Sequence, residues 1–261
     1  MRALRPAGAP PLRTVFLDLG DTLLHIHPSV PTLYLRTARE LGLDVDGATV
    51  GAALQHGERF YQAAVTERRR FESSLPDARD FWHEYHERVL AGLGVAPGAA
   101  RAALAQTLTE RFWSPGSWRA FPEVLGVLER LRSGGLQLAV VSNFTDALAA
   151  VCAAHELSPL LDGLVASTTV GAQKPDAAIF REALRRTGAD PAATVHVGDN
   201  YTTDVLGARA SGIAPILLDR RRAGTPAMFD FTRPDGAAGD RAVRLDCPVI
   251  GDLTELLALV V

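Results

Sequence analysis

Apolar and polar positions follow two different patterns along this chain, and each pattern predicts a different kind of structure. Short apolar runs of strand length occur at residues 14–17, 136–141, 164–166, 195–197 and 215–218. Stretches with helical spacing, such as 123–131 and 177–186, lie between them. Strands that alternate with helices predict right-handed βαβ crossovers and a parallel sheet covered on both faces. We therefore expect a doubly wound α/β fold whose ligands bind beyond the carboxyl ends of the strands.

Residues 27–117 show the second pattern, in which strand-like runs disappear and apolar residues recur at helical spacing. One stripe runs through Phe81, Tyr85 and Val89, and another runs from Leu104 to Phe112. The sequence predicts about four helices packed as a separate bundle after the first strand. We expect an α/β core domain made of residues 1–26 and 118–261 and an inserted helical cap domain at 27–117. The segment after Asp219 is predicted to be loop as far as residues 249–250, which precede a closing helix.

The composition of the chain limits the classes of protein to which it can belong. The chain has 261 residues, 47% of them hydrophobic and 22% charged, which is typical of a soluble globular protein. Its formal net charge of −3 gives no general attraction to nucleic acid, and no apolar run is long enough to span a bilayer. The two cysteines, Cys152 and Cys247, have no metal-ligand spacing and favour a reducing compartment. We expect a cytoplasmic monomer or homodimer with no nucleic-acid or membrane partner.

The most informative single residue is Lys174, because it is the only lysine among the 27 basic Lys and Arg residues. A compact ammonium group at one position, where arginine serves everywhere else, indicates chemistry that a planar guanidinium cannot perform. Three polar segments accompany Lys174 in the chain, at residues 18–22, 142–143 and 198–204, and each follows a predicted strand. The carboxyl ends of parallel strands meet at one edge of a sheet, so we expect these segments to converge.

These four segments, in this order, resemble the motifs of the haloacid dehalogenase superfamily of hydrolases. The resemblance covers nearly the whole chain and is strongest from Arg119 to Asp219, which is similar to the group named haloacid dehalogenase-like hydrolase domain-containing proteins. It implies that Asp18 is the nucleophile, which forms an aspartyl phosphate that water then hydrolyses. It also implies that Lys174 and Mg²⁺ stabilise the transferring phosphoryl group, with the metal bound by Asp18, the backbone carbonyl of Gly20 and Asp199.

The resemblance implies supporting roles for four further residues. Asp204 is expected to orient Lys174 or a metal-bound water. Ser142 and Asn143, with help from Thr22, are expected to hold the phosphoryl oxygens that do not react.

One position departs from the pattern of the superfamily's phosphatases. These enzymes usually carry an aspartate two residues after the nucleophile, where it serves as general acid and base, but this chain has Gly20 there. The neighbouring Asp21 is one residue too far along, and a side chain shifted by one residue in an extended loop usually points elsewhere. Loss of a general acid typically slows turnover about 10²–10⁴-fold.

Three functions remain open on this evidence. The favoured one is a Mg²⁺-dependent phosphatase of a small phosphorylated metabolite. A 2-haloacid dehalogenase needs no protonated leaving group, which suits Gly20, but it also needs no metal, and related dehalogenases lack the carboxylate that Asp199 provides. The third is a regulatory protein that binds at the phosphate site with little turnover.

Several other residues carry no functional prediction. Trp82, Trp113 and Trp118 are predicted to pack in the interior of the helical insertion, and His83 and His86 are spaced three apart, too close for a zinc protease signature. Five arginines of the insertion could meet an anionic substrate, but a solvated helix face is the better interpretation for most of them: Arg36, Arg39, Arg68, Arg69 and Arg70.

Overall fold

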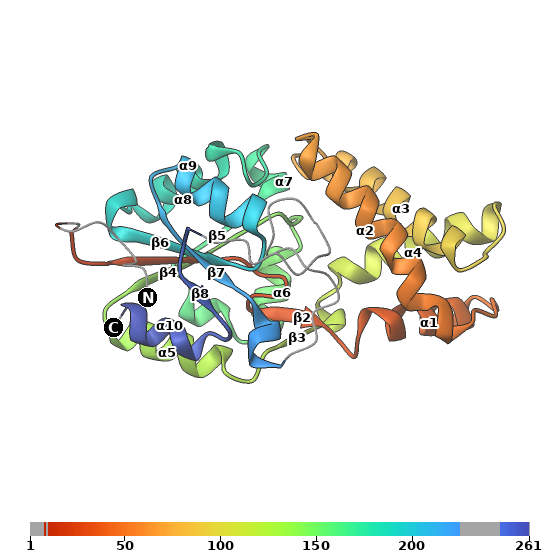
Figure 1. Ribbon diagram of the computed structural model, residues 1–261, viewed down its shortest axis with the longest axis horizontal. Helices are drawn as coiled ribbons and strands as arrows, with labels where there is room; N and C mark the ends of the chain where they lie inside the picture. Colours follow the sequence, from red (N-terminus) through yellow and green to blue (C-terminus); the bar gives the residue numbers. More distant parts are fainter. Residues whose placement is uncertain (1–7, 9, 225–245, 261) are drawn as a thin grey trace.

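The structure is a computed structural model that describes residue 8, residues 10–224 and residues 246–260 (Figure 1). Most of the loop predicted after Asp219 lies outside the described residues. The chain forms a six-stranded parallel sheet in the order β5-β4-β1-β6-β7-β8 and a separate two-stranded antiparallel pair, β2 with β3. The strands are β1 Thr14–Leu17, β2 Leu24–Ile26, β3 Trp118–Ala120, β4 Gln137–Ser142, β5 Gly163–Ala166, β6 Thr194–Gly198, β7 Ala214–Leu218 and β8 Val249–Ile250.

Ten α-helices accompany the strands in the described part of the chain. They are α1 Val30–Glu40, α2 Val50–Thr66, α3 Leu75–Gly92, α4 Ala99–Trp113, α5 Val124–Ser133, α6 Leu148–Ala154, α7 Ser167–Val170, α8 Ala177–Thr187, α9 Gly207–Ala210 and α10 Thr254–Val260. The predicted doubly wound α/β fold is confirmed, and each predicted strand of the large sheet is present within a residue or two of its expected bounds.

Alternate side chains of each central strand enter two different apolar layers, because successive residues of a strand point to opposite faces. Val15 and Leu17 of β1 pack with residues of α5 and α10, whereas Phe16 packs with residues of α8 and α9. Figure 1 shows these helix pairs on opposite sides of the sheet. Burial on both faces explains why these strands are continuous apolar runs in the sequence.

Helices α1 to α4 form a bundle that leaves and rejoins the α/β part through β2 and β3 (Figure 1). Leu24 of β2 pairs with Ala120 of β3, so the two segments that connect the bundle to the α/β part lie side by side. The bundle has its own apolar cluster, distinct from the clusters that include residues of the sheet. Helices α1 and α3 begin where the sequence supplies caps: Ser29 and Ser74 each accept a hydrogen bond from a backbone N–H of the first turn.

Two of the three tryptophans pack differently from the prediction. Trp82 contacts the bundle cluster as expected, but Trp113 and Trp118 pack against the cluster of the α/β part, because they lie where the chain returns to the sheet. His86 is buried in the bundle, where Tyr34 Oη lies 2.5 Å from its Nδ1 and burial lowers its pKa to about 3. His86 is therefore a structural residue.

Candidate functional site

Several predicted site residues lie at the carboxyl ends of adjacent strands, at the point where the strand order of the sheet reverses. Asp18 follows β1, Ser142 and Asn143 end β4, and Asp199 follows β6. Strands β4 and β6 flank β1 because the chain first extends the sheet on one side of β1 and then crosses to the other side. Ligands of doubly wound sheets bind at this kind of switch point.

The ammonium group of Lys174 lies between two carboxylates. Its Nζ is 2.5 Å from Asp18 Oδ1 and 2.6 Å from Asp204 Oδ1, and the lysine is 3% exposed. Burial alone would lower the pKa of Lys174, but the two carboxylates raise it above its ordinary value. The side chain therefore remains a cation and keeps a fixed position beside Asp18.

Asn143 holds the backbone of Lys174 in place. Its Oδ1 accepts a hydrogen bond from the Lys174 N–H at 2.6 Å, and its Nδ2 donates to the Lys174 carbonyl at 3.1 Å. Both functions of the amide thus contact the lysine, a role that sequence reasoning did not assign to it. Ser142 is 4% exposed and lies at the end of β4 beside Asn143.

Asp204 is held by protein donors on both of its oxygens. Oδ1 accepts from Lys174 and lies 2.8 Å from His196 Nε2, and Oδ2 accepts from the Asn200 N–H at 3.0 Å. Burial alone would raise the pKa of Asp204, but Lys174 and His196 together lower it by more. The pKa is therefore below its ordinary value, and the carboxylate stays ionised. Asp204 therefore contacts the Lys174 ammonium, and both of its carboxylate oxygens already have protein partners.

Two local features bring Asp204 to Lys174. Residues Tyr201–Leu206 wind as a short π-helix, and such turns are frequent at functional sites. Gly198 leaves room for the carboxylate, because a Cβ at this position would lie 2.2 Å from Asp204 Cγ. Sequence reasoning missed His196 as a partner of Asp204, since a histidine inside an apolar strand gives no separate signal.

Three carboxyl groups surround the single ammonium of Lys174, so their full ionisation would leave a net negative charge. Oxygens of Asp18, Asp199 and Asp204 lie within 4.8 Å of one another. Burial raises the pKa of Asp199 well above its ordinary value, and Asp21, Asp18 and Asp204 add to this increase. Closely spaced carboxylates of this kind fit a hard divalent cation, which prefers oxygen ligands. Asp18 and Asp199 suit it better than Asp204, whose oxygens are already taken.

The loop after Asp18 leaves one polar atom unpaired. Thr22 Oγ1 is buried without a hydrogen-bond partner among the described residues, as expected for a group that contacts a ligand. Asp21 has a left-handed backbone with φ of 50°, and its side chain is exposed, although its charge acts on Asp199. Gly20 has no positive φ, and a Cβ there would meet only the Trp118 ring, at 3.7 Å.

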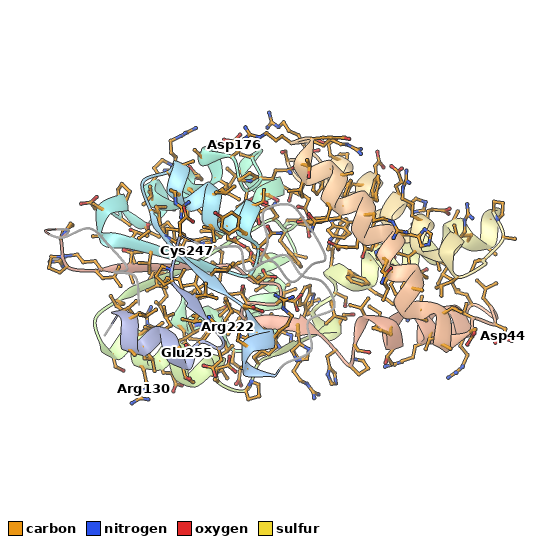
Figure 2. The ribbon with its side chains drawn as sticks, in the orientation of Figure 1. Asp44, Arg130, Asp176, Arg222, Cys247 and Glu255 are labelled. Carbon is orange, nitrogen blue, oxygen red and sulfur yellow. The ribbon has the colours of Figure 1, made fainter. Side chains whose placement is uncertain are left out.

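The helical insertion contacts the Lys174 loop through Gln173. Gln173 Oε1 accepts hydrogen bonds from the N–H groups of Phe71 and Glu72, and Gln173 Nε2 donates to the Arg69 carbonyl. Figure 1 shows α7, which precedes Gln173, beside the connection between α2 and α3. In Figure 2, Asp44 marks the far end of the insertion, whereas Asp176 lies on the α/β part.

The five arginines of the insertion are exposed, as the interpretation of solvated faces requires. Arg70 nevertheless reaches the α/β part, since its Nη2 donates to the Gly171 carbonyl at 2.6 Å. Arg69 lies over the rings of Phe60 and Phe81.

Among the helices of the described residues, none has the length and apolar character that a membrane span requires.

Comparisons with known proteins agree with this geometry. Residues 12–212 match the model of the haloacid dehalogenase-like hydrolase family. The chain is 32% identical to haloacid dehalogenase-like hydrolase domain-containing protein 3 of Bos taurus, over 84% of this chain and 86% of that protein. It is 31% identical to a phosphoserine phosphatase of Thermus thermophilus, over 80% and 89% of the two chains.

The fold is also found among solved structures. The putative HAD-hydrolase YfnB of Bacillus subtilis, whose structure is described as bound to magnesium, superposes with a TM-score of 0.74 at 16% identity, over 96% of this chain and 99% of that one. At this identity the likeness concerns the fold alone. The family model and the relatives together establish that this chain belongs to the haloacid dehalogenase-like hydrolases.

Proposed function

We propose that this hydrolase is a Mg²⁺-dependent phosphatase that acts on a small phosphorylated metabolite through an aspartyl phosphate on Asp18. The observation that carries the proposal is the position of Lys174 between Asp18 and Asp204, inside a cluster of carboxylates that needs a further cation. The phosphatase among its relatives supports this choice of substrate class.

The contact between Asp18 and Lys174 supports Asp18 as the nucleophile. Lys174 donates to its Oδ1, which keeps the carboxylate oriented and leaves Oδ2 for attack on phosphorus. The same ammonium can stabilise charge on the transferring phosphoryl group without moving. The hydroxyl groups of Thr22, in the loop after β1, and of Ser142, at the end of β4, would hold oxygens that do not react.

The metal would be held by Asp18, Asp199 and the carbonyl of Gly20. When bound, Mg²⁺ would offset the charge of these carboxylates and of the phosphoryl group, as a Lewis acid does in phosphoryl transfer. Asp204 keeps Lys174 in position, and His196 and Asn200 in turn hold Asp204.

Residues 27–117 would act as a cap over the strand ends. The contacts of Gln173 with the connection between α2 and α3 support a closed arrangement, in which the insertion excludes water from the phosphoryl group. Residues 1–26 and 118–261 would form the core domain beneath it.

The fold alone does not separate a phosphatase from a 2-haloacid dehalogenase. Asp199 favours the phosphatase, because displacement of halide by a carboxylate needs no second carboxylate or metal, whereas a phosphoryl group brings two negative charges that must be offset. A protein that binds at the phosphate site without turnover would bind phosphate analogues in Mg²⁺ and release no product.

A metal-dependent assay separates the three functions. The purified protein is incubated with aryl and acyl phosphates in Mg²⁺ or in excess chelator, and with 2-chloropropionate as a dehalogenase substrate. We expect phosphate release only in Mg²⁺, none from Asp18→Asn, and no chloride release. Chloride release that survives the chelator would support a dehalogenase instead, and phosphate release unchanged by the chelator would exclude the metal mechanism.

A further inference from the structure

A carboxyl group from the helical insertion reaches the Lys174 site. Glu72 lies in the connection between α2 and α3 and is 4% exposed. Its N–H donates to Gln173 Oε1 at 2.6 Å, and the preceding N–H of Phe71 donates to the same oxygen at 2.7 Å. Because Gln173 directly precedes Lys174, these bonds bring the Glu72 backbone to the loop that carries Lys174, whose charge acts on the Glu72 carboxyl.

One oxygen of the Glu72 carboxyl accepts a hydrogen bond from Trp82, and the other is left for a ligand. Trp82 Nε1 donates to Oε1 at 3.0 Å. Oε2 is buried and makes no hydrogen bond of normal geometry to the described residues, although the Asn143 amide is near enough to lower the pKa of Glu72. Trp82 is itself packed in the bundle, so the fixed oxygen has a rigid support. A buried carboxyl oxygen without a hydrogen bond lowers the stability of the folded chain unless a ligand bonds to it.

Glu72 is close enough to the catalytic groups to be influenced by their charges. Burial raises the pKa of Glu72 to about 8, against smaller decreases from Trp82, Lys174 and Asn143, and Asp18 raises it slightly further. The group therefore carries a proton at neutral pH and can release it within the range in which enzymes work.

The site lacks an acid at the usual position, since Gly20 has no side chain. In an in-line displacement the leaving oxygen lies opposite the attacking Asp18, on the side away from the strand ends, where the insertion lies. We propose that Glu72, supplied by the insertion, is the general acid and base of this hydrolase and replaces the carboxylate absent at Gly20. This proposal rests on the phosphatase function proposed above.

The two steps balance in atoms and charge. In the first, Asp18 Oδ2 bonds to phosphorus, the P–O bond to the leaving group breaks with its electron pair on that oxygen, and the Glu72 proton converts this oxygen to a hydroxyl. In the second, a water oxygen bonds to phosphorus, the bond to Asp18 breaks and restores its carboxylate, and Glu72 takes the proton from the water. The products are the alcohol and hydrogen phosphate, and Glu72 is again protonated.

Asp21 is the rival for this role, but its surroundings suit it less. Burial raises the pKa of Asp21 as well, against a decrease from His25 and with a further increase from Asp18. Asp21 is nevertheless exposed, whereas Glu72 is 4% exposed, and a general acid is better kept from bulk water. The charge of Asp21 also raises the pKa of Asp199, which groups it with the carboxyl groups around the proposed metal site. Asp21→Asn is therefore part of the test.

The test compares Glu72→Gln with Glu58→Gln, a matched control. Glu58 is a second carboxyl of the insertion whose pKa burial raises, to about 7, but it contacts Gln62 of its own helix. Rapid acid quench in Mg²⁺ measures phosphoenzyme formation and hydrolysis with acetyl phosphate and with an alkyl phosphate. Thermal unfolding and near-ultraviolet circular dichroism confirm that each variant is folded.

We expect Glu72→Gln to slow phosphoenzyme formation from the alkyl phosphate by about 10²-fold or more, since an alkoxide needs the proton. Formation from acetyl phosphate should change less than about threefold, because its leaving group needs little protonation. Hydrolysis of the phosphoenzyme should slow, so that it accumulates. Glu58→Gln and Asp21→Asn should keep the leaving-group dependence of the wild type.

Trp82→Phe provides a second variant that keeps Glu72 and the aromatic packing. It removes the N–H that lowers the pKa of Glu72, so the decline of the alkyl phosphate rate at high pH should move to higher pH. The proposal is overturned if Glu72→Gln retains the wild-type leaving-group dependence, or if Asp21→Asn alone shows the steeper one. If the wild type forms no phosphoenzyme, the proposed function itself fails and this role fails with it.

Discussion

Arg220 Nε donates a hydrogen bond to the backbone carbonyl of Asp21 at 3.0 Å, although the two residues are 199 positions apart in the chain. Arg220 Nη2 donates to the Thr22 carbonyl at 2.5 Å, and Nη1 pairs with Glu123 at 2.8 Å. The guanidinium also lies 3.4 Å from the centre of the Phe121 ring. One buried side chain therefore fixes the loop that follows Asp18.

Arg220→Lys should impair both activity and stability. A lysine has one nitrogen and cannot reach two carbonyls and a carboxylate in a single plane. We expect turnover to fall by at least about tenfold and the free energy of unfolding by about 2–4 kcal/mol, the range for breaking buried, charged hydrogen bonds. Urea unfolding and phosphate release measure the two effects.

Arg222→Lys is the control for this change, because Arg222 is exposed and donates only to the Val249 carbonyl among the described residues. It should leave turnover and stability within experimental error. Equal behaviour of the two variants would show that Arg220 has no special role in the loop.

Lys174→Arg should lose at least 10²-fold in turnover, equivalent to about 2.7 kcal/mol, the scale of removing one transition-state hydrogen bond. The larger planar group cannot occupy the buried point between Asp18 and Asp204, each within 2.6 Å of the present ammonium. Cooperative unfolding should persist and shows that the chain folds. Turnover close to that of the wild type would mean that charge alone suffices at this position.

Gly20→Asp should be accepted by the fold, since Gly20 has no positive φ and the nearest atom to an added Cβ is a Trp118 ring carbon at 3.7 Å. The new carboxyl would supply an acid from the core, so rates with alkyl phosphates should rise more than rates with aryl phosphates. Combined with Glu72→Gln, it should restore part of the lost rate. A series of esters with graded leaving-group pKa measures this, and no gain with any ester of a folded variant would contradict it.

Stability should depend on pH through Glu72. Burial raises its pKa from 4.5 to about 8, so the folded chain binds this proton more tightly than the unfolded chain does. Its stabilising contribution is complete below about pH 4.5 and is lost as the pH rises through about 8. Relative to Glu72→Gln, which cannot ionise, the wild type should lose about 1–3 kcal/mol between pH 5 and pH 9 in urea unfolding. Parallel pH profiles would show that the carboxyl is hydrated.

The sequence predicted the elements whose signals are local. The strand that precedes Asp18 matches its predicted bounds because its apolar residues enter two buried layers. The pair of β2 and β3 was missed, since each strand has three residues and its partner lies about a hundred residues away.

The site shows the same division between local and distant signals. Asp18 and Asp199 directly follow strands, and Lys174 is marked as the only lysine of the chain. Glu72, Gln173 and Arg220 could not be identified, because contacts across 101 to 199 residues make them relevant. His196 looks like any residue of a buried strand until its bond to Asp204 is seen.

The predicted metal site can be tested without turnover. Mg²⁺ should raise the unfolding temperature of the wild type, since a ligand that binds only the folded state stabilises it. Asp199→Asn should abolish most of this increase, because it removes a charge that the cation offsets. Asp162→Asn, a carboxylate paired with Arg132 away from the site, should respond to Mg²⁺ like the wild type. An equal response of Asp199→Asn would place the ion elsewhere.

The most direct test of the account is whether the phosphoryl group is transferred to Asp18. The wild type is mixed with acetyl phosphate in Mg²⁺, quenched in acid and digested, and the peptide that contains Asp18 is examined by mass spectrometry. We predict one phosphoryl group on this peptide, removable by hydroxylamine as an acyl phosphate is, and absent from Asp18→Asn. Phosphate release without any phosphorylation of Asp18 would contradict the account.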